Sequence, residues 1–581
     1  MTTNMRLWSS IAVWFALSVA GIGQKAPADT ILLHGRIYTV NAKHPWAQAL
    51  AIRDGKLVAV GSDKEIARYR GPSTQVLDAK GRMVLPGITD SHVHFLDGSF
   101  SLERINLEDV KDRDEAVRQL KKYADAHPKD AWVLGRGWSY PMFPPTGLPD
   151  KKYLDAAIPD RPVYLEGFDG HTWWANSKAL ELAHITKDTP DPTGGEIVRD
   201  PKTGEPTGAI KEDAADDLVR RVIPDPSRDE KLQALRAGLK HANELGVTRV
   251  HVMGGVNPGE GDISEIDLLD QLRKSGELTV RFYIAYRMDP PAVTDAQLKQ
   301  IEQMRQKFHD DWLAGGVVKF FLDGVIETHT AAMLAPYSDD PAVSGSLLWD
   351  PEKYKQYVAE FDRRHVQVCT HAIGDRAIRL ALDAYENAAT TNGTKDARHR
   401  IEHIEDVSAA DIPRFGKLGV IASMQPLHSY PDEDTLDVWL KNVGPERGTR
   451  AWAMQSIAKT GGTLAFGSDW PVVTLNPWYG VQNAVTRQTR DGKPDGGFVP
   501  HERLTLEQAI EGYTLGAAKG ARRERTEGSI APEKLADLIM LSQDLFKVGS
   551  AEIYKTEVVM TMVAGKIVYQ KNPGSHTEKG N

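Results

Sequence analysis

The chain has 581 residues, of which 41% are hydrophobic, and its formal net charge is -9. A chain of this length and composition buries a large core, either as one big domain with appendages or as two to four domains. The acidic balance and the lack of a long Lys/Arg block argue against nucleic acid as a partner. Cys369 is the single cysteine, so an intramolecular disulfide is impossible and the fold depends on its core.

The first 23 residues predict an export signal. Arg6 precedes an apolar run that ends in small residues suited to cleavage near positions 18–24. The alternative is an uncleaved membrane anchor, but the run is slightly short for a membrane span and is interrupted by serines. We therefore expect a periplasmic or secreted protein that contacts no membrane once residues 1–23 are removed.

The two ends of the chain share one sequence pattern, in which short β-rich runs are separated by turns that contain glycine. These runs cover residues 30–40, 48–61, 75–87, 536–543 and 557–570. They predict a small β-sandwich-like domain built from residues 29–86 and 525–572, with the long middle of the chain inserted into it. Two unrelated β-pieces are the alternative.

The middle of the chain alternates helical segments with short apolar strands. The predicted strands are 83–88, 247–253, 279–286, 316–322, 366–370, 400–404, 418–424 and 462–468. Alternation to a total of eight predicts an α/β protein with a (β/α)8 TIM barrel over residues 83–524, whose active site lies at the C-terminal ends of the strands. A doubly wound open sheet is the alternative, but no glycine-rich phosphate loop follows any of these strands.

Residues from about 100 to 225 interrupt the alternation of helices and strands. They predict an inserted subdomain over the barrel mouth. The segment is rich in proline and glycine and carries five aromatic residues that could form pocket walls. They are Trp138, Tyr140, Phe143, Trp173 and Trp174. Core packing is the ordinary interpretation of each one taken alone.

Metal-competent side chains stand at the ends of several predicted strands. His92 and His94 are two residues apart, so on an extended strand they point to the same side. The other members are Lys319, His371, His403 and Asp469. Each alone has an ordinary explanation, such as a core histidine or a helix cap. Together they predict a site for Zn²⁺ or a similar divalent ion, since imidazoles and carboxylates suit such ions and a single cysteine excludes a thiolate-rich site.

Several motifs along the chain resemble the amidohydrolase superfamily, in the branch of YtcJ-like amidohydrolases and N-substituted formamide deformylases. The motifs are PGITDSHVH, GFDGHTWWANSKAL, TGEPTGAIKE, VVKFFLDG, THAIGDRAI, RIEHIE, SMQP and FGSDWPV, in that order. The resemblance covers nearly the whole chain after the predicted signal. It is specific for the family rather than for a substrate.

The resemblance implies a site for one or two divalent ions per chain. It places one ion on His92, His94 and Asp469 and a second on His371 and His403. Lys319 would be carboxylated and would bridge the two ions, a state that suits a lysine in the apolar run 317–322 because a free ammonium is costly to bury. Asp469 would also accept a proton from the attacking water.

Residues at the predicted barrel mouth are candidates for substrate contact. His171 is the main one and also a second catalytic candidate, with Gln425 and Trp138 as weaker ones. In the segment 323–331, which begins at Asp323, Glu327 and His329 stand where related sequences tend to have a glycine and an arginine. Val252 stands where an aspartate is common. These departures affect the substrate more than the metal chemistry.

The expected function is hydrolysis of an amide-type C–N bond in a small-molecule substrate of the N-formyl or N-acyl amine class, by a metal-activated water. A lactone or phosphoester hydrolase on the same site is the first alternative. A non-catalytic exported binding protein is the second, although such a protein would be expected to have lost ligands and all six positions are filled here. The exact substrate, the identity of the metal and the choice between a monomer and a homodimer stay open.

Overall fold

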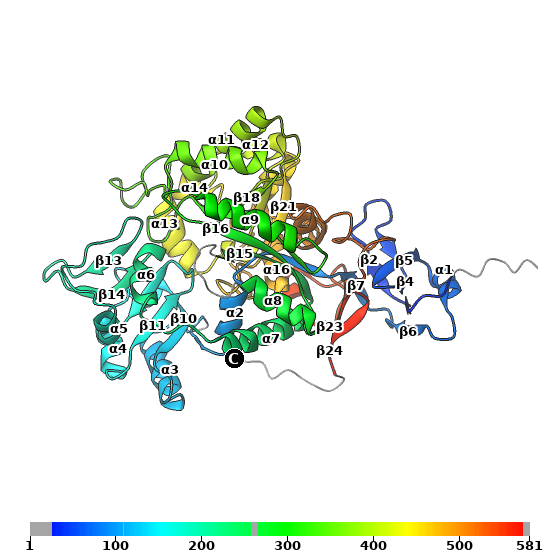
Figure 1. Cartoon of the computed structure of the whole chain (residues 1–581), viewed down its shortest axis with the longest axis horizontal. Helices are drawn as coiled ribbons and strands as arrows, with labels where there is room; N and C mark the ends of the chain where they lie inside the picture. The colour runs from blue at the N-terminus through cyan, green and yellow to red at the C-terminus, as the bar shows by residue number, and fades with distance from the viewer. Residues whose placement is uncertain (1–25, 109, 257–264, 573–581) are drawn as a thin grey trace, which may run out of the picture.

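The computed structural model describes residues 26–108, 110–256 and 265–572. The predicted export signal, residues 1–23, lies outside these ranges. Within them, no helix has both the length and the apolar content needed to cross a membrane. Figure 1 shows three parts: an inserted subdomain, a central barrel and a small β-domain on the opposite side.

Eight parallel strands form the central barrel, in the order β21-β20-β19-β18-β17-β16-β15-β8. They are β8 (Ile88–Val93), β15 (Val247–Val256), β16 (Arg281–Met288), β17 (Leu313–Phe321), β18 (Gln367–Ala372), β19 (Arg400–His403), β20 (Ile421–Met424) and β21 (Thr463–Phe466). A single parallel bridge between Val93 and Trp470 joins the two ends of the sheet. The predicted TIM-barrel fold class is therefore confirmed.

Helices follow the barrel strands and cover their outer face (Figure 1). They are α7 (Arg228–Glu244), α8 (Glu265–Lys274), α9 (Asp295–Lys307), α10 (Pro351–Arg363), α11 (Asp375–Asn392), α12 (Ile412–Leu418), α15 (Met454–Lys459) and α16 (Pro477–Thr486). Helix α7 shows why such segments are helical. It begins at a capping box between Ser227 and Glu230, and it buries Leu232, Leu235 and Leu239 on one face.

The first predicted strand, residues 83–88, corresponds to two elements in different parts of the protein. Strand β7 (Met83–Pro86) pairs with β2 (Arg36–Tyr38) and β22 (Leu538–Leu541) of the small β-domain, and the barrel strand begins only at Ile88. Gly87 joins them. A Cβ at Gly87 would lie 2.2 Å from Thr248 Oγ1, so glycine allows the chain to pass close to β15 as it leaves one sheet for the other.

The small β-domain combines strands from both ends of the chain. A six-stranded sheet has the order β24-β23-β22-β7-β2-β3, and a four-stranded sheet has the order β5-β4-β1-β6. The strands are β1 (Thr30–Leu33), β2 (Arg36–Tyr38), β3 (Trp46–Ala47), β4 (Ala49–Arg53), β5 (Lys56–Gly61), β6 (Gln75–Asp78), β22 (Leu538–Leu541), β23 (Val558–Val563) and β24 (Lys566–Gln570). Leu32 and Leu50 of one sheet share a core with Val84 and Leu538 of the other, so the sheets pack as a sandwich.

The inserted subdomain is a six-stranded sheet with the order β13-β14-β12-β11-β10-β9. Its elements are β9 (Ile105–Asn106), α3 (Arg113–Ala126), β10 (Val133–Trp138), α4 (Lys151–Ala157), β11 (Val163–Gly167), β12 (Thr172–Ala175), α5 (Ser177–Leu182), β13 (Glu196–Arg199), β14 (Pro206–Lys211) and α6 (Asp213–Arg220). Four of the five aromatic residues predicted as pocket walls instead form its core, because their rings pack edge to face with one another: Trp138, Tyr140, Phe143 and Trp174.

Candidate active site

A cleft with a volume of about 1150 Å³ opens between the C-terminal ends of the barrel strands and the inserted subdomain. The barrel contributes His92 and Asp469 to its wall, and the subdomain contributes Phe168, His171 and Trp173. A concave cavity of this size is typical of a small-molecule site, and charged and polar side chains make up much of its lining. The strand ends are where TIM-barrel enzymes carry their catalytic groups.

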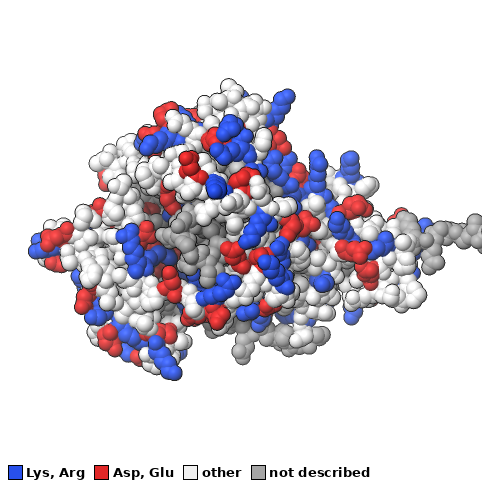
Figure 2. All heavy atoms as spheres, viewed as in Figure 1, with Lys and Arg blue, Asp and Glu red and all other residues white. Residues whose placement is uncertain are grey.

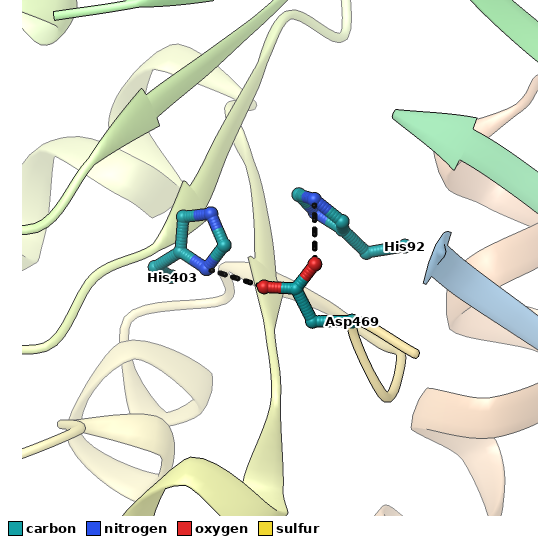
Figure 3. A group of neighbouring side chains, drawn as sticks. All are labelled: His92, His403 and Asp469. Atoms are coloured by element: carbon teal, nitrogen blue, oxygen red, sulfur yellow. Dashed lines mark ion pairs between the residues drawn. The ribbon is translucent and has the colours of Figure 1, made fainter. Parts of the chain in front are cut away.

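His92, His403 and Asp469 converge at the floor of the cleft. Figure 3 shows the Asp469 carboxylate between the two imidazole rings. Asp469 Oδ1 lies 3.4 Å from His92 Nε2, and Asp469 Oδ2 lies 3.7 Å from His403 Nδ1. One potential ligand atom from each residue lies within 4.8 Å of the other two. Two imidazoles and a carboxylate are a suitable donor set for a divalent ion such as Zn²⁺.

His94 approaches the same carboxylate from the residue that follows β8. Its Nε2 lies 3.1 Å from Asp469 Oδ1. Although two imidazole nitrogens are this close, Asp469 Oδ1 is buried without a hydrogen-bond partner in the described part of the chain. Buried polar atoms are normally hydrogen-bonded. A buried carboxylate oxygen that has imidazole nitrogens at 3.1 and 3.4 Å but no aligned hydrogen bond is the arrangement expected of metal ligands.

Lys319 and His371 lie beside this group. Lys319, on β17, is fully buried, and its Nζ is 3.4 Å from His92 Nε2. His371, on β18, has its ring centroid 4.5 Å from that of His403. His371 Nε2 lies 3.2 Å from the carbonyl oxygen of Gly324, within hydrogen-bonding distance. The structure therefore brings all six predicted side chains to one place, while the compact group of three contains neither His94 nor His371.

A buried ion pair orients His92. Glu402 Oε2 accepts a hydrogen bond of 2.8 Å from His92 Nδ1, and Arg400 donates to both oxygens of Glu402. Burial disfavours the charged carboxylate, but Arg400 and His92 outweigh it and hold the pKa of Glu402 well below its usual range. Burial, helped by the charge of Lys319, lowers the pKa of His92 to about 4. His92 is therefore neutral, with its proton on Nδ1 and its Nε2 lone pair toward Asp469.

The turn that carries Asp469 is fixed onto the first barrel strand. Asp90, on β8, accepts hydrogen bonds from the backbone N–H groups of Ser468 and His92. The N–H of Asp469 donates to the carbonyl of His92 over 2.7 Å. A Cβ at Gly467 would lie 2.5 Å from His92 N. A glycine and a buried carboxylate thus let the turn lie against β8, which sets the position of Asp469.

Comparison with known proteins identifies the family. The family model described as "Amidohydrolase family" matches residues 75–569. The chain belongs to the amidohydrolase family. It is 34% identical to Protein LONG AFTER FAR-RED 3 of Arabidopsis thaliana, over 93% of this chain and 92% of that protein. It is 29% identical to the putative amidohydrolase YtcJ of Bacillus subtilis, over 93% and 99% of the two chains.

Two further relatives support the branch and the fold of this amidohydrolase. It is 24% identical to an N-substituted formamide deformylase of Arthrobacter pascens, over 94% of this chain and 98% of that protein. A crystal structure titled as an uncharacterized metal-dependent hydrolase from Pyrococcus horikoshii superposes with a TM-score of 0.70 at 26% identity. That match covers 90% of this chain and 99% of the other. The resemblance inferred from the sequence motifs is confirmed.

His171 reaches the amidohydrolase cleft from the inserted subdomain. Its Nδ1 lies 2.8 Å from Glu212 Oε2, and Glu212 Oε1 accepts a hydrogen bond from Thr330 Oγ1. The ring centroids of His171 and His371 are 5.7 Å apart. Glu212 thus connects the subdomain to the barrel and orients His171 toward the group of ligand candidates.

The structure corrects two predicted substrate contacts. Trp138 is fully buried in the core of the inserted subdomain, where its indole N–H donates to the carbonyl of Leu165. His329 lies away from the cleft wall and has its Nε2 2.9 Å from Asp339 Oδ1. In both cases a local partner takes up the polar group that was expected to meet the substrate.

Of the remaining predicted substrate contacts, one is buried behind a ligand candidate and two line the cleft. Gln425 is fully buried, and its Oε1 lies 3.0 Å from His403 Nδ1, which suits a role in orienting His403. Asp323 and Glu327 both line the cleft. Asp323 accepts three backbone N–H hydrogen bonds, and burial nevertheless raises its pKa to about 8. Val252 also lines the wall.

Sequence reasoning missed His428. It lies on the 3₁₀ helix η3 (Pro426–Ser429), just after β20, with its ring parallel to that of His403 at a centroid distance of 6.0 Å. His428 Nε2 is 3.9 Å from Asp469 Oδ2, and Nδ1 is 3.8 Å from Glu405 Oε1. The sequence signal that could have identified His428 is its position three residues beyond Gln425, at the end of a barrel strand.

Proposed function

We propose that this amidohydrolase cleaves an amide-type C–N bond in a small molecule of the N-formyl or N-acyl amine class. The observation that carries the proposal is Asp469 Oδ1, which is buried, lacks a hydrogen bond and lies 3.1 and 3.4 Å from two imidazole nitrogens. The relative titled N-substituted formamide deformylase, which matches along 94% of this chain, supports the choice of bond.

The donor set at the floor of the cleft fits a divalent ion, and we propose Zn²⁺. His92, His403 and Asp469 would hold it, with His94, Lys319 and His371 beside them. When bound, the ion would act as a Lewis acid and lower the pKa of a water molecule toward neutrality. The cleft then has to supply a proton acceptor, a group that meets the leaving amine and a wall that excludes water.

We propose Asp469 as the proton acceptor. Burial opposes its ionisation, but His92, His94 and His403 outweigh it and hold the pKa of Asp469 well below its usual range. Asp469 is therefore ionised at neutral pH and can take a proton from the attacking water. His171 is the second catalytic group that we propose, because the carboxylate of Glu212 at its Nδ1 fixes the orientation of a ring that lines the cleft.

Lys319 is proposed to be carboxylated. Burial lowers its pKa to about 8, so the neutral amine needed for attack on CO₂ is more accessible than in an exposed lysine. The nitrogen forms a bond to carbon, one proton leaves, and the product is a carbamate anion. A ¹³C carbamate signal after growth or incubation with labelled bicarbonate would support this state, and its absence from the Lys319→Ala variant would assign the position.

The test of the proposed function is a substrate panel for the zinc-loaded protein, made of N-formyl amines, N-acyl amino acids, lactones and phosphotriesters. We expect turnover of an amide substrate, with loss of turnover on chelation and recovery when zinc is returned. Turnover confined to lactones or phosphotriesters would overturn the proposed bond. Tight zinc binding without turnover of any member would indicate a binding protein instead.

A further inference from the structure

His171, the second proposed catalytic group, comes from the inserted subdomain, whereas every ligand candidate comes from the barrel. Its place in the cleft therefore depends on what joins these two parts. The face in Figure 2 carries acidic and basic side chains in contact with water, where ion pairs contribute little. The contact between Glu212 and His171 differs, because their side chains are only 13% and 19% exposed. A hydrogen bond shielded from water in this way is electrostatically stronger.

The backbone of Glu212 is strained. Its φ of 62° and ψ of 155° lie in a region that essentially only glycine adopts. Glu212 occupies the N-cap position of α6, yet its side chain makes no capping hydrogen bond to that helix. The carboxylate instead lies 2.8 Å from His171 Nδ1 and 2.7 Å from Thr330 Oγ1. Strain of this kind persists only where the surroundings impose it, and it is concentrated at functional sites.

Thr330 has a single proton to donate, and its surroundings direct that proton to Glu212. The backbone N–H of Val325 and the hydroxyl of Thr328 each lie 2.9 Å from Thr330 Oγ1. Two acceptors compete for the proton, Glu212 Oε1 at 2.7 Å and the carbonyl of Val325 at 3.2 Å. The shorter, charge-assisted bond to the carboxylate is the stronger one. Val325 and Thr328 then donate to the two lone pairs of Thr330, so the hydroxyl is fully engaged.

The barrel segment that carries Thr330 also touches a ligand candidate. A Cβ at Gly324 would lie 2.2 Å from Thr330 Oγ1 and 2.8 Å from Glu212 Oε1, so a larger residue would force the two apart. The carbonyl oxygen of Gly324 lies 3.2 Å from His371 Nε2. The ring centroids of His371 and His171 are 5.7 Å apart. One segment of the barrel thus meets both imidazoles, one directly and the other through Thr330 and Glu212.

We infer that Thr330 is a positioning residue: through Glu212 it holds His171 beside the ligand candidates, so that His171 is aligned only while the inserted subdomain rests on the barrel. This inference rests on the proposed function, in which His171 takes part. A hydrogen-bonded carboxylate at Nδ1 sets the orientation and the tautomer of an imidazole. Loss of such an outer partner typically lowers activity about 10- to 100-fold.

The kinetic test replaces the hydroxyl of Thr330 by a methyl group and then restores it. On an amide substrate of the zinc-loaded protein, we expect kcat to fall about tenfold in Thr330→Val and about 10- to 100-fold in Glu212→Gln. KM should change less than about threefold, because substrate contacts remain. Thr330→Ser should keep at least about a third of the wild-type kcat, since it keeps the hydrogen bond. A serine variant as impaired as the valine variant would overturn the inference.

The matched controls lie at exposed positions. They are Thr391→Val on α11 and Glu507→Gln on α17 (Leu506–Glu511), and both should leave kcat unchanged. A double-mutant cycle then shows whether Thr330 acts through His171. Adding Thr330→Val to His171→Ala should cost less than about a further twofold in kcat, because the ring to be positioned is gone. Losses that multiply in full would show that Thr330 acts on something else and would overturn the inference.

Hydrogen exchange separates this inference from the proposed function, because it requires no turnover. We expect backbone amides in residues 166–175 and 206–212 to exchange faster in Thr330→Val and at the wild-type rate in Thr330→Ser. That result without hydrolysis of any amide by the wild type would overturn the proposed function and leave the anchoring of the subdomain standing. Amide hydrolysis with the same kcat in Thr330→Val and the wild type would overturn the inference, whatever the exchange rates, and leave the proposed function intact.

Discussion

At the scale of single residues, the site depends on which atoms have partners. Asp469 Oδ1 faces His92 and His94 without a hydrogen bond, whereas His92 Nδ1 is fully engaged by Glu402. The first atom is available to an ion, and the second holds the imidazole in the tautomer that an ion needs. Trp138 and His329 are not among the described residues that line the cleft, and each has a local partner.

Replacing Asp469 by asparagine keeps the size of the side chain and one ligand oxygen but removes the proton acceptor. General base catalysis contributes about 10²- to 10⁴-fold, so we expect kcat to fall by that order with a smaller change in substrate binding. Steady-state kinetics on protein of measured zinc content tests this. A variant that keeps its zinc and loses less than about tenfold in kcat would reduce Asp469 to a ligand.

Replacing Glu402 by glutamine should weaken zinc binding. The change removes the charge that orients His92 Nδ1–H, and loss of such a partner typically lowers metal affinity about 10- to 100-fold. Competition with a chromophoric chelator measures the affinity directly, with Glu507→Gln as the matched surface control. Because Arg400 loses its counter-charge, the melting temperature is recorded in parallel. Unchanged affinity in a folded Glu402→Gln protein would show that His92 needs no such partner.

Sequence reasoning proposed six ligand candidates that lie near one another in the structure, because strand ends of a barrel share one edge and side chains far apart in sequence converge there. It could not find Glu402 and Arg400, since a charged pair on a short strand has the same pattern whether it faces solvent or the barrel interior. His428 was missed for a related reason, because it lies on a short helix after β20 whose direction depends on tertiary packing.

At the scale of elements, the sequence pattern shows that an apolar strand exists but not where one strand stops and the next begins. The run at 83–88 appeared as one strand because Gly87 is flanked by apolar residues on both sides. The structure divides it at Gly87, where close packing against Thr248 leaves no space for a side chain. The aromatic residues of the insertion were likewise consistent with either a pocket wall or a core. The edge-to-face packing of Trp138, Tyr140, Phe143 and Trp174 shows that these four form a core.

Gly87→Ala should therefore destabilise the protein by about 1–3 kcal/mol, the usual cost of overpacking. The added Cβ would lie 2.2 Å from Thr248 Oγ1, so the double variant with Thr248→Ala should recover part of the loss. Gly549→Ala is the control, since nothing lies within 4 Å of a Cβ there. Urea denaturation measures all three. Equal stability of Gly87→Ala and the wild type would contradict the close approach of β8 and β15.

Asp362, near the end of α10, makes the stability of the barrel depend on pH. Burial raises its pKa, but the His399 imidazole, whose Nε2 lies 3.2 Å from Asp362 Oδ1, and hydrogen bonds from Asn392 and Thr394 outweigh that effect and lower the pKa to about 2. A carboxylate with a depressed folded-state pKa contributes stability above its unfolded pKa of about 4. That contribution is lost as the pH falls through the folded pKa. The hydrogen bonds join α10 to α11 and to the segment before β19.

Asp362→Asn should lower the free energy of unfolding by about 1–3 kcal/mol at neutral pH, because it removes hydrogen bonds to a charged group. The difference from the wild type should shrink as the pH is lowered from about 4 toward about 2. Urea denaturation across that range measures it, with the exposed Asp188→Asn as control. A difference that stays constant down to the lowest pH would show that the charge of Asp362 contributes nothing.

At the scale of the whole molecule, two of the three parts form the site. The barrel supplies the ligand candidates, the inserted subdomain supplies His171 and one wall of the cleft, and the small β-domain joins the two ends of the chain at the side away from the subdomain (Figure 1). The barrel and the terminal sheets could be predicted from alternating patterns. The internal sheet of the subdomain could not, because its strands are short and its turns carry most of its prolines and glycines.

The central claim is that hydrolysis at this site depends on a divalent ion held by His92, His403 and Asp469. The most direct measurement combines metal analysis of the purified protein with amide turnover before and after exhaustive chelation. We expect one to two divalent ions per chain, loss of turnover with their removal, and recovery in proportion to the zinc restored. Undiminished turnover by protein shown to be free of metal would contradict the claim.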